Sequence, residues 1–181
     1  MPTYIALLRG INVGGNKIIK MQDLKAMLLS QGLENVRTYI QSGNIVFESG
    51  EVSGDGLARM MEERIRETFG FEVPVIIRTQ EELETAIQAN PFPLEQQEDY
   101  KRLYVSFLDQ TPAAGALDKL TPYEDGADKL RVVGKELYTL YEVSVSQSPL
   151  FKIQLDKLLG VQLTARNWNT VNKLAALCRQ V

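Results

Sequence analysis

The sequence predicts an α+β protein made of two tandem halves that share one order of strands and helices. Short apolar runs of strand length alternate with segments whose apolar residues recur at helical spacing. This order repeats once along the chain, and the match is tightest at the end of each half. There, Val73–Thr79 aligns with Val161–Asn167 without a gap, so that Arg78 coincides with Arg166.

The first half reads as β-α-β-β-α-β-α. We expect strands at 4–8, 36–40, 44–48 and 73–77, and the proline in the last of these favours an edge position. Helices are expected over 21–28, over 57–69 and after Thr79, where Thr79 and Glu82 have the spacing of a capping box. The charged residues Glu62, Glu63, Arg64, Arg66 and Glu67 indicate a solvated helix face with internal ion pairs.

The second half repeats this order. We expect strands at 103–108, 129–133, 136–141 and 161–165. One helix is predicted to begin at Thr111-Pro112, with the proline in its first position. Another is predicted to run from Ser148-Pro149 to Gly160, and the last follows the N-cap residue Asn167.

The β-α-β-β-α-β order is that of a ferredoxin-like fold, in which two helices cover one face of an antiparallel sheet. We therefore predict a ferredoxin-like half over residues 1–90 and another over 100–181, each closed by a C-terminal helix. Residues 91–99, which include Pro91 and Pro93, form the predicted linker. Because either half alone would have a small core, we expect the two halves to pack together.

Composition limits the chemistry that the protein can perform. Its 181 residues include no histidine, which excludes Ser-His-Asp and Cys-His catalysis, histidine zinc sites and a histidine pH switch. No residue pattern indicates a metal site. The net charge of −3 weighs against sequence-independent binding to nucleic acid, although a local basic patch is compatible with that charge.

The single cysteine, Cys178, rules out an internal disulfide and favours a reducing compartment, so we predict a cytoplasmic protein. Its position in an apolar helical pattern indicates a buried thiol and not a nucleophile. No apolar run is long enough to cross a bilayer, so we expect no membrane-spanning segment.

The first candidate site is the glycine-rich loop between the first strand and the first helix. Its candidate ligand-binding residues are Arg9, Asn12, Gly14, Gly15 and Lys17. A P-loop needs glycine directly before its lysine and a hydroxyl residue after it, but here Asn16 and Ile18 occupy those places. The pattern therefore disfavours a nucleoside triphosphatase. Two interpretations stay open: an anion-binding nest of backbone amides, or a tight connection with positive φ at its glycines.

The second candidate site is the start of the last helix. A helix start offers unpaired backbone amides, and Arg166 stands just before it, so the arrangement suits an anion. Trp168 would add a stacking face beside Asn167. The alternative is structural: Asn167 caps the helix, the tryptophan packs against the other half, and the arginine pairs with one of many carboxylates.

The third candidate comprises Gln41, Ser42 and Asn44, in a segment that reads as a hairpin turn. In a ferredoxin-like half we expect this hairpin at the end of the sheet opposite to the C-terminus of the first strand. On that expectation it meets the glycine loop only if the packing of the two halves brings them together.

Three motifs resemble those of one bacterial family. They are YIALLRGINVGG at 4–15, RTYIQSGN at 37–44 and RNWNTV at 166–171. Together they resemble domain-of-unknown-function family 1697, and the resemblance runs from near the first residue to near the last. It implies a two-part α+β protein with ferredoxin-like halves. It implies no substrate, cofactor or catalytic residue, so the motifs nominate candidate residues without giving them roles.

The leading hypothesis is a site for a small anionic or phosphorylated ligand, such as a nucleotide or metabolite, between loop 9–17 and the start of the last helix. Whether this site catalyses a reaction stays open, and no cofactor or oligomeric state is implied. The alternatives are an RNA- or protein-interaction module without catalysis, and motifs that only hold the two halves together.

Overall fold

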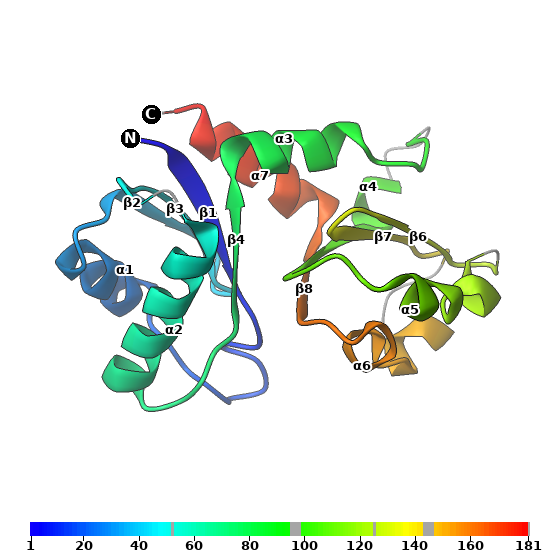
Figure 1. Cartoon of the computed structure of the whole chain (residues 1–181), viewed down its shortest axis with the longest axis horizontal. Helices are drawn as coiled ribbons and strands as arrows, with labels where there is room; N and C mark the ends of the chain where they lie inside the picture. Colours follow the sequence, from blue (N-terminus) through cyan, green and yellow to red (C-terminus); the bar gives the residue numbers. More distant parts are fainter. Residues whose placement is uncertain (52, 95–98, 125, 143–146, 181) are drawn as a thin grey trace. The chain divides into compact units, whose positions relative to one another are not determined.

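The computed structural model describes residues 1–51, 53–94, 99–124, 126–142 and 147–180 (Figure 1). These residues form two four-stranded antiparallel sheets with helices, so the chain is α+β. Two compact units are present. The first comprises Met1–Glu84 together with Lys173–Val181, and the second comprises Thr85–Asn172. Residues 95–98 of the predicted linker lie outside the described residues.

The sheet of the first unit has the strand order β2-β3-β1-β4. Its strands are β1 (Thr3–Leu8), β2 (Glu34–Tyr39), β3 (Asn44–Glu48) and β4 (Val75–Thr79). All neighbouring strands are antiparallel. The edge position predicted for the fourth strand is confirmed, because β4 pairs with β1 alone. Pro74 precedes β4 and lacks the N–H that continued pairing would need.

Two helices of the first unit, α1 (Met21–Ser30) and α2 (Gly54–Phe69), cover one face of this sheet (Figure 1). The buried residues of α2 recur every four positions at Leu57, Met61 and Ile65, so the predicted apolar stripe is confirmed. They pack in one core with strand residues of alternating position, among them Tyr4, Ala6, Leu8, Ile45 and Phe47.

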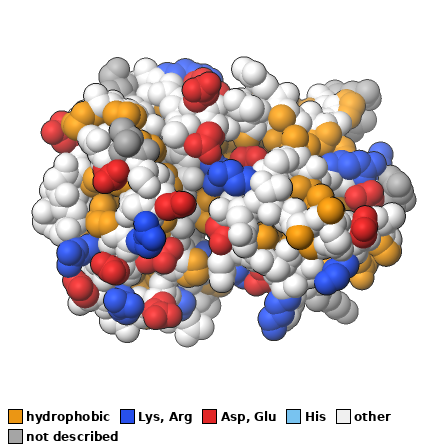
Figure 2. Space-filling view, viewed as in Figure 1, with side chains coloured by type: hydrophobic (Ala, Val, Ile, Leu, Met, Phe, Trp, Pro, Cys, Tyr) orange, Lys and Arg blue, Asp and Glu red, His pale blue; other side chains and the backbone are white. Residues whose placement is uncertain are grey.

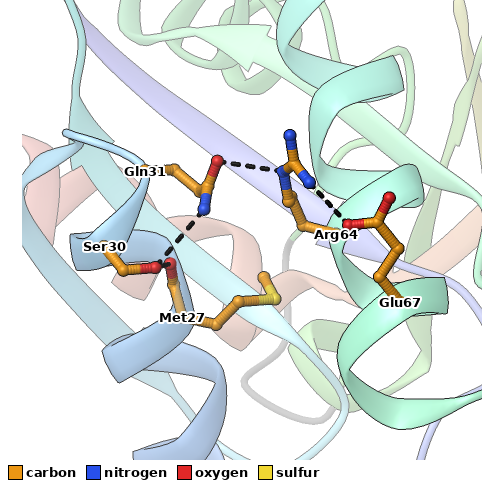
Figure 3. Close-up of polar contacts among 5 residues, drawn as sticks. All are labelled: Met27, Ser30, Gln31, Arg64 and Glu67. Atoms are coloured by element: carbon orange, nitrogen blue, oxygen red, sulfur yellow. Dashed lines mark hydrogen bonds and ion pairs between the residues drawn. The ribbon is translucent and has the colours of Figure 1, made fainter.

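Polar contacts connect the end of α1 to α2 (Figure 3). The Arg64 Nε donates to Gln31 Oε1 at 3.0 Å, and its Nη1 pairs with Glu67 at 2.5 Å. Ser30 Oγ in turn donates to the Met27 carbonyl. Charged side chains of both signs are interspersed over the region of Figure 2 where these helices lie in Figure 1. The predicted solvated helix face with internal ion pairs is therefore confirmed.

The sheet of the second unit has the equivalent strand order, β6-β7-β5-β8. Its strands are β5 (Leu103–Leu108), β6 (Lys129–Val133), β7 (Glu136–Leu140) and β8 (Leu163–Asn167). Tyr104 pairs with Asn167, as Tyr4 pairs with Thr79 in the first sheet. The sequence alignment of the last strands therefore agrees with the hydrogen-bonding register.

The helices of the second half are shorter than the sequence predicts. They are α4 (Asp99–Arg102), α5 (Ala114–Asp118), the 3-10 helices η1 (Thr121–Tyr123) and η3 (Pro149–Lys152), and α6 (Leu155–Leu159). The helix expected from Thr111-Pro112 begins only at Ala114, so the proline is not its first residue.

The prediction of a single helix from Ser148-Pro149 to Gly160 is also wrong. Ser148 does act as an N-cap, because its Oγ accepts the Leu150 amide. The turn that it starts is a 3-10 turn, which ends at Ile153 in extended conformation with ψ 127°. A new helix, α6, then runs to the predicted end at Gly160, whose φ of 68° is left-handed.

Two further helices, α3 (Gln80–Gln88) and α7 (Trp168–Cys178), contain residues of both units. Residues 80–84 of α3 belong to the first unit and 85–88 to the second, whereas α7 begins in the second unit and ends in the first. Within the part of the chain that the structure describes, no helix has the length and apolar character needed to span a bilayer.

Candidate functional site

The glycine-rich loop after β1 folds as a small hairpin. The Asn16 amide donates to the Val13 carbonyl at 3.0 Å, and the Asn12 amide donates to the Lys17 carbonyl at 3.1 Å. Between them Gly14 and Gly15 have φ values of 59° and 77°, the left-handed pair typical of a two-residue type I′ turn. The positive φ values that the tight-connection interpretation requires are therefore present, and the anion-binding nest stays a prediction.

Asn12 joins this loop to the turn between β2 and β3. Its Nδ2 donates to the Gln41 carbonyl at 2.7 Å and to the Ile19 carbonyl at 3.0 Å. Its Oδ1 accepts the Ile19 amide at 2.8 Å. The side-chain amide is thus engaged at both ends, and its observed role is to hold the loop together.

The expectation that the β2–β3 turn lies at the far end of the sheet from the glycine loop is wrong. Strands β1 and β3 are antiparallel neighbours, with Leu7 opposite Asn44, so the C-terminus of β1 meets the N-terminus of β3. The Leu8 amide accordingly donates to the Gly43 carbonyl at 2.9 Å. The first and third candidate sites therefore converge within one unit.

The residues of the third candidate serve the turn itself. Asn44 is fully buried, and its Nδ2 donates to the Tyr39 carbonyl at 2.9 Å and to Ser42 Oγ at 3.0 Å. Gly43 has a φ of 92°, and a Cβ there would lie 2.7 Å from Leu8 Cβ. The turn is therefore closely packed against the end of β1, while the Gln41 side chain is exposed.

A third segment completes what we call the loop cluster, defined as residues 9–20, 40–43 and 72–74. Lys17 Nζ donates to the Glu72 carbonyl at 2.6 Å, and the Arg9 amide donates to the Pro74 carbonyl at 3.0 Å. The cluster exposes apolar side chains, since Val13 is 64% exposed, Ile18 63% and Ile40 50%.

The second candidate site, at the start of α7, lies in the second unit. Arg166 is buried, and its Nη1 donates to Thr164 Oγ1 at 2.6 Å and to the Ala165 carbonyl at 2.9 Å. Burial lowers the pKa of the Arg166 guanidinium to about 10. The predicted cap is confirmed, because Asn167 Oδ1 accepts the Thr170 amide at 2.8 Å. Trp168 is only 6% exposed.

The structure thus brings Arg9, Asn12, Lys17 and Gln41 into one loop cluster of the first unit. It places Arg166–Trp168 in the second unit, and a joint site of the two groups stays a prediction. Among the described residues there is no group of three or more cysteine or acidic side chains placed to hold a metal ion.

The structure also reveals a groove that we did not predict from the sequence. It lies in the first unit, has a volume of about 600 Å³, and is lined by Lys25, Leu29, Asn35, Val36, Arg37 and Gln180. Arg37 donates its Nη1 to the Leu177 carbonyl at 2.6 Å. Among the described residues, its buried Nε and Nη2 atoms have no hydrogen-bond partner. The position of Arg37 inside a predicted strand is the sequence signal that could have indicated this groove.

Comparison with known proteins supports the fold and the family. A structure of a conserved bacterial protein from Streptococcus pneumoniae resembles this chain with a TM-score of 0.77, over 98% of both chains, at 23% sequence identity. At that identity the likeness shows the fold alone. No curated protein matches the sequence.

The family described as "Protein of unknown function (DUF1697)" matches residues 1–138. This span includes the motifs at 4–15 and 37–44, and therefore the loop cluster and Arg37, whereas the motif at 166–171 lies beyond it. Because the match covers well over half of the chain, this protein belongs to the DUF1697 family.

Proposed function

We propose that this protein binds a small anionic ligand in the groove of the first unit. The observation that carries the proposal is the charge of that groove. Lys25 and Arg37 are cationic, Asn35 and Gln180 carry amides, and none of the lining residues that the structure describes is acidic. A volume of about 600 Å³ is typical of small-molecule sites. An anion in this groove would meet two positive charges and hydrogen-bond donors from one compact unit.

The groove is a better location than the glycine loop expected from the sequence. The Asn12 amide is engaged at both ends, and Lys17 Nζ donates to a backbone carbonyl. Gly14 and Gly15 form a turn tip, and the Arg166 guanidinium donates within its own strand. A site that joins Arg9 and Lys17 to Arg166, Asn167 and Trp168 remains the alternative location.

A thermal-shift titration of the full chain with inorganic phosphate and with small organic phosphates tests the proposal. A ligand that binds only the folded state stabilises it by about 1.4 kcal/mol at a concentration ten times the dissociation constant. Lys25→Ala should abolish the shift, whereas Lys20→Ala, which removes a lysine outside the groove, should keep it. The absence of a shift for any anion at millimolar concentration would contradict the proposal.

The loop cluster supports a second candidate function, contact with another protein. Val13, Ile18 and Ile40 are exposed on loops that Asn12 holds in place, and a preorganised apolar surface favours association. Sedimentation velocity over a range of concentrations tests the simplest partner, a second copy of the chain. Association that is lost when these three residues become serine would support it, and a monomer at every concentration would exclude a second copy.

We also infer that each half has a ferredoxin-like topology and that the halves arose by duplication of residues 1–90 and 100–181 about a linker at 91–99. The strand orders β2-β3-β1-β4 and β6-β7-β5-β8 support this inference, as does the packing of α1 and α2 on one face of their sheet. A cytoplasmic location is inferred from the single cysteine, which favours a reducing compartment.

A further inference from the structure

The guanidinium of Arg37 is held at one end and unpartnered along one edge. Arg37 lies on β2 opposite Val46, and its Nη1 donates to the carbonyl of Leu177, near the end of α7. Among the described residues, Nε and Nη2 are buried and without a hydrogen-bond partner. Buried charged donors without partners are rare because their lost hydration is not compensated.

The two unpartnered atoms are a matched pair. In a guanidinium, the N–H bond of Nε and one N–H bond of Nη2 point in parallel from the same edge of the plane. This edge is the fork that binds both oxygens of a carboxylate or two oxygens of a phosphate. The bond from Nη1 to Leu177 uses a different part of the plane, so it fixes the guanidinium without occupying the fork.

The second sheet contains a natural control for this arginine. Arg131 on β6 lies opposite Tyr138, and Arg37 lies opposite Val46 at the equivalent place of the first sheet. Arg131 Nη1 donates to the carbonyls of Glu124 and Leu130 at 3.0 and 2.8 Å. The strand position therefore accommodates an arginine in both sheets, whereas Arg37 also lines the groove and has a buried fork without a partner among the described residues.

The rest of the groove indicates what accompanies the oxyanion. Lys25 and Leu29 are four residues apart on α1 and share one face of the helix. Leu29 is 47% exposed, so it offers apolar surface beside the two cations of the groove. The fork atoms are buried, so a ligand reaches them only if side chains that line the groove change rotamer, and the exposed Lys25 and Gln180 have the rotatable bonds to do so.

We propose that the groove binds a phosphomonoester with an apolar substituent, its phosphate oxygens on the Nε/Nη2 fork of Arg37 and its substituent on Leu29. This inference rests on the proposed anion-binding function and adds the ligand class and the atoms that recognise it. The dianionic phosphate matches the two cations Lys25 and Arg37 better than a monocarboxylate does.

Calorimetric titration of the full chain with n-butyl phosphate, inorganic phosphate, butyrate and butanol tests the ligand class. We expect n-butyl phosphate to bind most tightly, phosphate and butyrate more weakly, and butanol not at all. Arg37→Lys keeps the charge but removes the fork, and it should weaken n-butyl phosphate about tenfold. Arg131→Lys, the matched change in the second sheet, should leave the affinity unchanged.

The outcomes separate the two proposals. If no anion binds the wild-type chain, the anion-binding function and the fork both fail. If phosphate binding depends on Lys25 but survives Arg37→Lys at full strength, the function stands and the fork is wrong. If inorganic phosphate binds as tightly as n-butyl phosphate, or if Leu29→Ser leaves both affinities unchanged, the apolar substituent is wrong.

Local misfolding is monitored by the single thiol. Cys178 is 2% exposed at the end of α7 and follows Leu177, whose carbonyl binds Arg37. If the Arg37→Lys change released the end of α7 from β2, the Cys178 thiol would become reactive. If Arg37→Lys does expose the thiol, the variant no longer tests the fork, and the test is made on the wild-type chain by NMR. The Arg37 Nε–H resonance should move on addition of n-butyl phosphate, and an unchanged resonance at saturation would overturn the inference.

Discussion

The two sheets share one hydrogen-bonding register, and residues at equivalent positions make similar contacts in both units. Arg78 pairs with Ile5, and Arg166 pairs with Val105. Both arginines are buried, and the Nη1 of each donates to the carbonyl of the preceding residue. Because an arginine at this position makes the same backbone bond in both sheets, its role is structural. Arg166 therefore gives little reason to expect a ligand.

The loops attached to this common frame differ. The Leu8 amide donates to the Gly43 carbonyl, and the Leu108 amide makes the equivalent bond to the Lys135 carbonyl, both at 2.9 Å. Only the first unit adds the Gly14-Gly15 hairpin and the Asn12 contacts above that bond. In the second unit, residues 109–113 lead directly into α5. Asn12, Gly14 and Gly15 therefore have structural roles that belong to the first unit.

Gly43→Ala should cause the largest loss. A Cβ at this position would lie 2.7 Å from Leu8 and 2.9 Å from Ile11, and its φ of 92° is unfavourable for alanine. Steric overlap and left-handed strain together should cost about 3 kcal/mol of unfolding free energy. Gly134→Ala, in the corresponding turn of the second sheet, meets nothing closer than 3.9 Å and should cost about 1 kcal/mol. Urea denaturation measures both, and equal losses would contradict the tighter fit of Gly43.

Asn12→Ala should cause the next largest loss, because three hydrogen bonds disappear with the side chain. We expect about 2–3 kcal/mol, seen as faster amide hydrogen exchange at Ile19 and in the β2–β3 turn. Asn12→Gly is the matched control, since glycine accepts the φ of 54° without strain. Its loss of stability therefore reports the missing hydrogen bonds without the backbone strain that alanine adds. Exchange that accelerates equally throughout the second unit would show that Asn12 does not act locally.

The smallest effect should appear at alkaline pH and in the second unit. Burial, with a lesser contribution from Glu136, raises the pKa of Tyr138 well above 10, and burial raises that of Tyr141 to about 12. Because the folded pKa values exceed the unfolded ones, this stabilisation is complete below pH 10 and is lost as the pH rises toward 12. Tyr138→Phe should flatten the decline of stability above pH 10, although it also removes the bond to the Ala86 carbonyl. A decline that keeps its wild-type slope in this variant would contradict the assignment.

Local signals in the sequence predicted several helix starts and ends well, although not the helix lengths of the second half. Thr79 and Glu82 form the predicted capping box, and Gly70 and Gly160 end their helices in left-handed conformation. These features depend on residues a few positions apart. The strands that end at Thr79 and Asn167 both begin two residues later than predicted, and since only the first is preceded by a proline, Pro74 is not the general cause.

The groove could not be predicted in this way, because it depends on residues far apart in the chain. The carbonyl that holds Arg37 is 140 residues away in the sequence, and Gln180 comes from the same distant segment. The convergence of Asn12 with Gln41 likewise required the order of the strands, which apolar periodicity does not reveal. Arg9, Asn12, Lys17 and Gln41 of the loop cluster were predicted individually as candidates, but their contacts and the third segment at 72–74 were not.

The division of α7 between the units has a consequence for the order of synthesis. The first unit contains Met1–Glu84, which are made before the second unit, and also Lys173–Val181, which are made after it. A ribosome that has released Met1–Glu84 has therefore produced most of this unit but not the segment whose Leu177 carbonyl binds Arg37. The second unit, Thr85–Asn172, is continuous and emerges whole before the first can close. In this chain the unit that begins first is the one completed last.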